Sequence, residues 1–156
     1  MAAAAGALVQ AFTGAGIVGL DYSPASLTVL DQVIDREWPP GQKPATETIG
    51  MMGAYLGEVL VRNLGARWTD QTPTGEPGLK VGDGIAFPLS KVVKRVDIGN
   101  THSLSHFYSE LASYLVQGPT RTSSWTPREP PAGQPKTSTD LPRQPGFMDR
   151  FRRKPK

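Results

Sequence analysis

Two histidines and a glutamate are the residues whose types and spacing come nearest to a metal site. His102 and His106 stand four residues apart, so on a helix they lie one turn apart and could share a zinc ion. Glu110 is about 6 Å further along the axis, so the three side chains cannot readily close on one ion. A zinc protease also carries a glutamate directly after the first histidine, where this chain has Ser103. We therefore predict no metal and no cofactor, with both histidines on the polar face of the last helix.

Glu58 is the second candidate for chemistry, and two interpretations of it stay open. Tyr55 and Arg62 stand three residues before it and four after it, so all three share one stripe of a helix. In the structural interpretation, Glu58 pairs with Arg62 and stabilises the helix by about 0.3 kcal/mol. In the functional one, Glu58, Tyr55 and Trp68 surround a cleft. The predicted ligand- or partner-binding residues are thus Tyr55, Glu58, Arg62 and Trp68, and no residue is given a catalytic role.

Other catalytic and nucleotide-binding motifs are absent. The sequence lacks the Gly-x-Ser-x-Gly pattern of a nucleophile elbow. Residues 14–16 and 82–84 are glycine-rich, but neither is followed by the lysine and helix start of a phosphate cradle. The chain has no cysteine, which excludes disulfides, thiolate zinc sites and cysteine nucleophiles. The first basic residue is Arg36, so the positively charged start of a secretory signal is missing, and we expect a cytoplasmic protein.

The first element that positions these residues is predicted over residues 46–68. The pattern there indicates one amphipathic helix followed directly by a strand. Gly65 is placed for a left-handed C-cap. Gly50 and Gly57 share a stripe, and a glycine inside a helix costs about 1 kcal/mol against alanine, so we expect another backbone to approach there and Gly57 to be a packing position. The apolar residues that recur at helical spacing are Ile49, Met52, Leu56 and Leu60.

Two further helices are expected along the sequence, one before residues 46–68 and one after the strands of a small sheet. Ser23 is a suitable cap for a helix with Pro24 at its first position, ending before Pro39. Short strands at 67–69, 80–81 and 85–87, separated by turn residues, predict a three-stranded antiparallel sheet. The next helix opens at Pro88, with Leu89, Val92, Val93 and Val96 expected inside and Lys91, Lys94 and Arg95 on a solvated face. These cations lack interleaved aromatic residues, so we expect no specific nucleic-acid binding.

The last helix is expected from about Thr101. Its apolar spacing places Leu104, Phe107, Tyr108, Leu111, Tyr114 and Leu115 on the core. The predicted fold class is α+β, with about four helices packed against a small antiparallel sheet of three short strands.

The charge distribution divides the chain into two segments of different composition. Residues 118–156 hold nine Lys/Arg, three Asp/Glu and eight of the fifteen prolines, for a net charge of +6, whereas residues 1–117 carry −3. Such a segment buries too little apolar surface to offset its ordering entropy. We expect residues 1–16 to be a flexible or weakly helical lead-in, 17–117 a single globular domain, and 118–156 a disordered basic tail rich in Pro, Ser and Thr.

The end of the tail contains a candidate anchor for an anionic surface. Phe147 and Phe151 lie one helical turn apart in a cationic run, which would place both rings on one side. Membrane lipid or an acidic protein would suit this pattern, whereas a solvated basic tail without specific function is the alternative. The predicted anchor residues are Phe147, Phe151, Arg150, Arg152, Arg153 and Lys154.

The segments LDYSPASLTVLDQVID, GAYLGEVLVRNLGARW and GIAFPLSKVVKR resemble a family of small bacterial domains of unknown function, of actinobacterial type. A Gly-x-Tyr-x-Gly-Glu helix, with a tryptophan ten residues after the glutamate, carries most of the likeness, which covers about residues 17–117. The resemblance implies a small α+β unit and no particular mechanism. The positions that match the pattern are Gly53, Tyr55, Gly57, Glu58, Trp68 and Pro88.

Two functions from different classes follow. The first is a non-catalytic protein-interaction module, with an unidentified protein partner and a basic tail that reaches an anionic membrane surface weakly. The second is a small enzyme or ligand-binding protein with a cleft around Glu58. The sequence favours the first, because it contains no clustered set of titratable residues.

Overall fold

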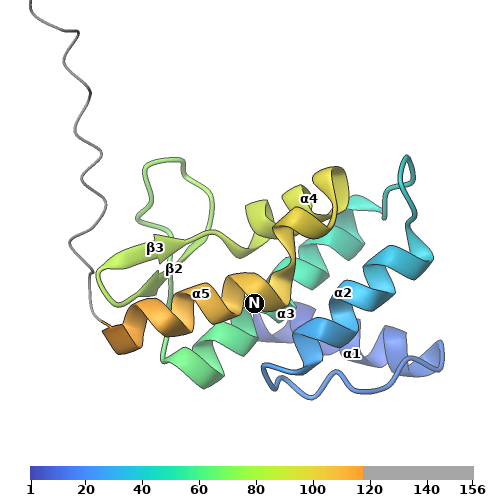
Figure 1. Ribbon diagram of the computed structural model, residues 1–156, viewed down its shortest axis with the longest axis horizontal. Helices are drawn as coiled ribbons and strands as arrows, with labels where there is room; N and C mark the ends of the chain where they lie inside the picture. Colours follow the sequence, from blue (N-terminus) through green and yellow to red (C-terminus); the bar gives the residue numbers. More distant parts are fainter. Residues whose placement is uncertain (118–156) are drawn as a thin grey trace, which may run out of the picture. The chain divides into compact units, whose positions relative to one another are not determined.

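The computed structural model describes residues 1–117, and the predictions for residues 118–156 lie outside the described part. The described chain is α+β, as expected, with five α-helices and a three-stranded antiparallel sheet (Figure 1). The elements are α1 (Ala2–Gly14), α2 (Ser26–Glu37), α3 (Thr46–Leu64), β1 (Arg67–Thr69), β2 (Gly78–Val81), β3 (Gly84–Ala86), α4 (Pro88–Ile98), the 3-10 turn η1 (Asn100–His102) and α5 (Leu104–Gln117).

Helix α3 is the centre of the fold. Every residue from Met52 to Leu60 is buried, so the helix is covered on all sides. Figure 1 shows the other helices around it, with the sheet at the end where α3 leads into β1. Gly65 ends α3 in the left-handed conformation, with φ of 66°, and its amide donates to the Leu60 carbonyl. The predicted glycine C-cap is confirmed.

Helix α1 differs from the expected lead-in, because it forms part of the core. It packs along α3, and its side chains Ala5, Leu8 and Phe12 are buried. Alanine is the best helix former, and its small side chain lets two helices approach closely. Residues 1–16 were expected to stay outside the globular domain because a helix rich in Ala and Gly shows little contrast between its faces. This is the fifth helix that the sequence analysis did not count.

The sheet matches its prediction closely. β1 pairs with β2, and β2 with β3, both antiparallel, and β2 begins at Gly78, two residues before the predicted start. Trp68 lies opposite Leu79, which lies opposite Ala86. Residues directly opposite one another share a face of a sheet, and this is the face that meets the core, since Leu79 is fully buried.

Helix α4 has Val92 buried and Val96 packed against the core, as predicted, but it differs from its prediction at three other positions. Its buried residues are Pro88, Val92 and Arg95, whereas Leu89 and Val93, expected inside, are 37% and 38% exposed. Arg95, expected on a solvated face, is 1% exposed. The prediction for these three side chains was wrong, because it weighed hydropathy alone and an arginine is buried only where carboxylates can pair with it.

Asp31 of α2 provides that pairing. Arg95 Nε donates to Asp31 Oδ1 at 2.8 Å, and Arg95 Nη2 donates to Asp35 Oδ1 at 2.8 Å. Asp31 also accepts hydrogen bonds from the Leu104 and Ser105 amides, at 3.0 and 3.1 Å, and so caps the N-terminus of α5. Burial alone would raise the pKa of Asp31, but these hydrogen bonds outweigh it and hold the pKa below 3.8. One carboxylate therefore ties α2, α4 and α5 together.

Helix α5 begins later than expected, and this separates the two histidines. His102 ends η1, whereas His106 lies in the first turn of α5, so the prediction that one helix carries both was wrong. Ser103 lies between the two elements with φ of −44° and ψ of 138°, which interrupts the helix, and the next amide, that of Leu104, donates to Asp31 Oδ1 at 3.0 Å. Of the predicted apolar stripe, Leu104 is buried and the rest is half-buried, except Leu115, which is 36% exposed.

Candidate binding groove

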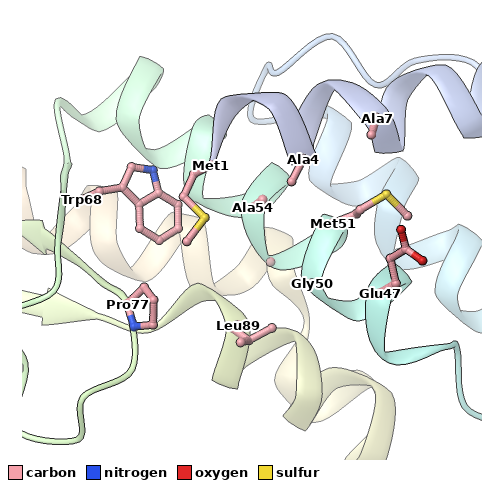
Figure 2. Close-up of a pocket in the computed structure, with 11 residues that line it drawn as sticks. Met1, Ala4, Ala7, Glu47, Gly50, Met51, Ala54, Trp68, Pro77 and Leu89 are labelled. Atoms are coloured by element: carbon pink, nitrogen blue, oxygen red, sulfur yellow. The ribbon is translucent and has the colours of Figure 1, made fainter.

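An apolar groove of about 400 Å³ lies between α1, α3 and α4 (Figure 2). Figure 2 shows Trp68 and Pro77 at one end and Met51 and Glu47 at the other. Among the lining residues, Glu47 is the only one with a charged side chain. The groove can therefore accept apolar groups along its length and one polar contact at its end. Its lining residues are Met1, Ala4, Ala7, Glu47, Gly50, Met51, Gly53, Ala54, Trp68, Pro77 and Leu89.

Small side chains on two neighbouring helices create this groove. Ala4 and Ala7 stand one turn apart on α1, and Gly50 and Ala54 stand one turn apart on α3. A Cβ added at Gly50 would meet no atom within 4 Å, so this position faces open space. The prediction that another backbone approaches this glycine stripe is therefore wrong at Gly50, where the missing side chain leaves a hollow instead.

Helix α4 supplies the opposite wall. A Cβ at Gly53 would lie 3.1 Å from the Leu89 Cα, so the absence of a side chain at Gly53 lets α4 approach α3 closely. Leu89 then stands at the edge of the groove rather than in the core, which accounts for its exposure.

Trp68 closes one end of the groove and is held by Gly57. A Cβ at Gly57 would overlap the Trp68 ring, so the predicted packing role of Gly57 is confirmed. The indole Nε1 is buried and has no hydrogen-bond partner among the described residues. Of the predicted site residues within 1–117, Trp68 alone lines the groove.

Tyr55 lies elsewhere, in a buried hydrogen-bonded cluster. Its hydroxyl donates to Ser26 Oγ at 2.6 Å and accepts from the Tyr22 amide at 3.1 Å. The two tyrosine rings are stacked, with centroids 4.9 Å apart, and Tyr22 has a positive φ of 64°. Burial raises the pKa of Tyr55. These contacts hold the loop before α2 against α3, which is a structural task.

Glu58 and Arg62 form the pair expected from their spacing. Arg62 Nε lies 3.8 Å from Glu58 Oε2, and the guanidinium lies 3.7 Å from the centroid of the Tyr22 ring. The Glu58 side chain is 11% exposed and is not among the residues that line the groove. The structure therefore brings Tyr55 and Arg62 together around Tyr22, with Glu58 paired to Arg62, and none of these three lines the groove with Trp68.

The histidine region contains one close contact between a histidine and a carboxylate. His106 Nε2 lies 3.3 Å from Glu110 Oε1, with both side chains more than half exposed. Within residues 1–117, no three His, Asp or Glu side chains come close enough to hold a metal ion.

Sequence reasoning missed most of the groove because its lining residues carry no chemical signal. Ala4 and Ala7 lie in an alanine-rich segment that indicates no binding role, and the helical spacing of Leu89 predicted a core residue. The one usable signal was the glycine stripe of α3, which indicated an unusual helix surface. The predicted anchor residues Phe147, Phe151, Arg150, Arg152, Arg153 and Lys154 lie outside the described part of the chain.

Comparison with known protein families identifies the domain. A family of unknown function, DUF6278, matches residues 3–114. The chain belongs to the DUF6278 family. The match confirms the expected resemblance to a small domain of unknown function, and it includes helix α1, which the expected limits of 17–117 left out. The curated proteins and the solved structures gave no match. Within the described part of this DUF6278 domain, every helix is too short or too polar to cross a membrane.

Proposed function

We propose that the DUF6278 domain of this chain is a non-catalytic protein-interaction module whose binding surface is the groove between α1, α3 and α4. The observation that carries the proposal is an exposed, almost wholly apolar hollow with a floor of small residues. Large apolar hollows on a soluble domain mark binding surfaces.

The chemistry of the groove fits an amphipathic helix of a partner protein. Ala4, Ala7, Gly50 and Ala54 allow a helix to approach closely. Trp68 at one end of the groove and Leu89 at its edge offer apolar contacts. Glu47 lies at one end, where it is suited to a basic or amide group of the partner. The occupant we expect is thus a helix with apolar side chains at i, i+3 or i+4 spacing and a basic residue near one end.

A small apolar ligand is a second candidate, because about 400 Å³ lies within the range of ligand pockets. The ligand-binding alternative from the sequence analysis is thus retained, but its proposed site is the groove next to Trp68 rather than a cleft around Glu58. A bacterial source and a cytoplasmic location also belong to the proposal, the latter supported by the absence of cysteine. So does weak contact of the C-terminal anchor with an anionic membrane.

A groove-filling substitution tests the interaction. Gly50→Leu places a side chain in the open space of the groove, and it should stabilise α3 by up to about 1 kcal/mol because it replaces a helical glycine. Gly6→Leu is the matched control, since Gly6 is also helical, has equally open space and does not line the groove.

Partners cross-linked to the parent protein would be purified and titrated by calorimetry against all three proteins. We expect a partner helix that binds the parent and Gly6→Leu with a negative heat-capacity change, and that loses at least about tenfold in affinity for Gly50→Leu. Equal binding to Gly50→Leu would contradict the proposal. Displacement of an apolar dye by small ligands, without any effect of the partner, would favour the second candidate.

A further inference from the structure

Half of the lysine and arginine side chains in residues 1–117 have an acidic partner within the described part of the chain, and the other half do not. Four of the eight lie in ion pairs: Arg36, Lys43, Arg62 and Arg95. The remaining four make no ion pair with any described residue, although this part of the chain carries a net charge of −3. They are Arg67, Lys80, Lys91 and Lys94, from the sheet and from α4.

On the sheet, two of these cations stand side by side. Arg67 lies directly opposite Lys80, which lies directly opposite Ile85, so the three side chains share the outer face. All three are exposed. Like charges directly opposite one another destabilise a sheet, and an anion bound across them would remove that cost.

Beside Ile85, the surface forms a second hollow of about 330 Å³ between β3, α4, η1 and α5. Lys91 and Lys94 stand on its α4 side, and Ile85, Phe107 and Leu111 line it with apolar groups. Lys91 Nζ lies 5.0 Å from the centroid of the Phe107 ring. Burial lowers the pKa of Lys91, and the neighbouring charge of Lys94 lowers it further against the opposite effect of two carboxylates. A bound anion would stabilise the charged form of this lysine.

We propose that this basic surface, made of Arg67, Lys80, Lys91 and Lys94, binds an acidic protein segment that inserts one aliphatic or aromatic side chain into the hollow beside Ile85. The cations supply charge complementarity, and the apolar hollow supplies a pocket for an anchor. It shares no lining residue with the groove between α1, α3 and α4, so the two surfaces are separate.

An acidic protein segment fits this surface better than nucleic acid or lipid. A nucleic-acid backbone extends beyond four cations, and this part of the chain as a whole carries eleven acidic residues against eight basic ones, which disfavours a longer polyanion. A flat bilayer surface does not enter a concave hollow, whereas a single side chain does.

The test uses the full chain and peptides selected on it from a displayed random library, then synthesised with a fluorescent label. We expect the selected peptides to carry several Asp or Glu around one or two apolar residues. Affinity would be measured by fluorescence anisotropy for Arg67→Glu/Lys80→Glu, for Lys91→Glu/Lys94→Glu and for Ile85→Ser. Arg36→Glu/Lys43→Glu is the control. It changes the net charge by the same amount, at two exposed residues that do not belong to the proposed basic surface.

Each double variant of the basic surface should lose about tenfold or more in affinity, and the control should stay within about twofold. Ile85→Ser should lower the affinity for the selected peptide. It should not change the affinity for a version of that peptide in which the apolar anchor residue is replaced by alanine. Arg67→Glu/Lys80→Glu keeps the test decisive if the α4 variant unfolds, since both its sites are exposed strand positions. An equal loss in the control, no acidic enrichment, or stronger competition by phosphatidylserine vesicles or a single-stranded oligonucleotide would overturn the proposal.

Discussion

Arg95 of α4 and Asp31 of α2 form a buried ion pair, with Nε 2.8 Å from Oδ1 and side chains 1% and 10% exposed. The two residues are 64 positions apart in the sequence. Because Asp31 also caps α5, the pair fixes three helices, and α4 in turn places Leu89 at the groove and Lys91 at the basic surface. Both proposed binding surfaces depend on this contact for their geometry.

Asp31→Ala should therefore destabilise the domain strongly. Removing one partner of a buried ion pair leaves an uncompensated charge, and we expect a loss of about 3 kcal/mol, the lower end of the usual range because Asp35 still accepts from Arg95. Urea unfolding followed by circular dichroism measures it. The control Glu37→Ala breaks the exposed pair with Arg36 and should cost less than about 1 kcal/mol. Equal stability of the two variants would show that the buried pair is not needed.

The same carboxylate predicts a pH dependence. The folded-state pKa of Asp31 lies below the ordinary value of 3.8, so the unfolded chain takes up the proton at a higher pH than the folded one. The stability that Asp31 provides is thus fully present above about pH 5, and it falls as the pH drops through the folded-state pKa. The difference in unfolding free energy between the parent and Asp31→Ala should shrink as the pH falls from about 5 to about 2. A difference that stays constant would contradict the assignment of the low pKa to Asp31.

Gly57 and Gly50 should respond oppositely to a side chain. Gly57→Leu drives a side chain into the Trp68 ring and should cost about 2 kcal/mol or more, as overpacking does. Gly50→Leu meets open space and should be at least as stable as the parent. Thermal unfolding of both variants measures the contrast. If Gly57→Leu melts with the parent, the close contact between α3 and β1 is not maintained in solution.

The sequence was sufficient for the elements whose signals are local. The period of α3, the Gly65 cap, the three strands and Pro88 at the start of α4 all follow from backbone preferences and spacing, and the structure confirms them. The Glu58–Arg62 pair is equally local, since both residues lie on one helix.

What could not be predicted depends on contacts between distant elements. Arg95 looks like a surface residue until Asp31 is known to lie beside it, and a separation of 64 positions in the sequence hides that. Helix α1 looks weak because alanine gives no hydrophobic contrast, although it packs on α3. The groove is a space between helices, and a space leaves no pattern in the sequence.

Leu8→Ala tests whether α1 belongs to the core. Leu8 is fully buried, so the truncation should cost about 2–5 kcal/mol, the usual range for a buried leucine. Val18→Ala is a suitable control, because Val18 is 74% exposed and its truncation should change stability by less than about 0.5 kcal/mol. Chemical unfolding of both variants gives the values. A cost for Leu8→Ala as small as that of the control would return α1 to the role of a loose lead-in.

The C-terminal anchor predicted from the sequence can be tested without any knowledge of its structure. Phe147 and Phe151 lie among Arg150, Arg152, Arg153 and Lys154, and each basic residue near an anionic membrane contributes about 1 kcal/mol. We expect the full chain to sediment with phosphatidylserine-containing vesicles at low salt, and to be released at high salt because screening weakens the attraction. Phe147→Ser/Phe151→Ser should reduce binding, since it removes the two inserted rings and leaves the charges in place. Vesicles of phosphatidylcholine alone are the control. Binding that is absent at low salt, or unchanged in the double variant, would leave only a solvated basic tail.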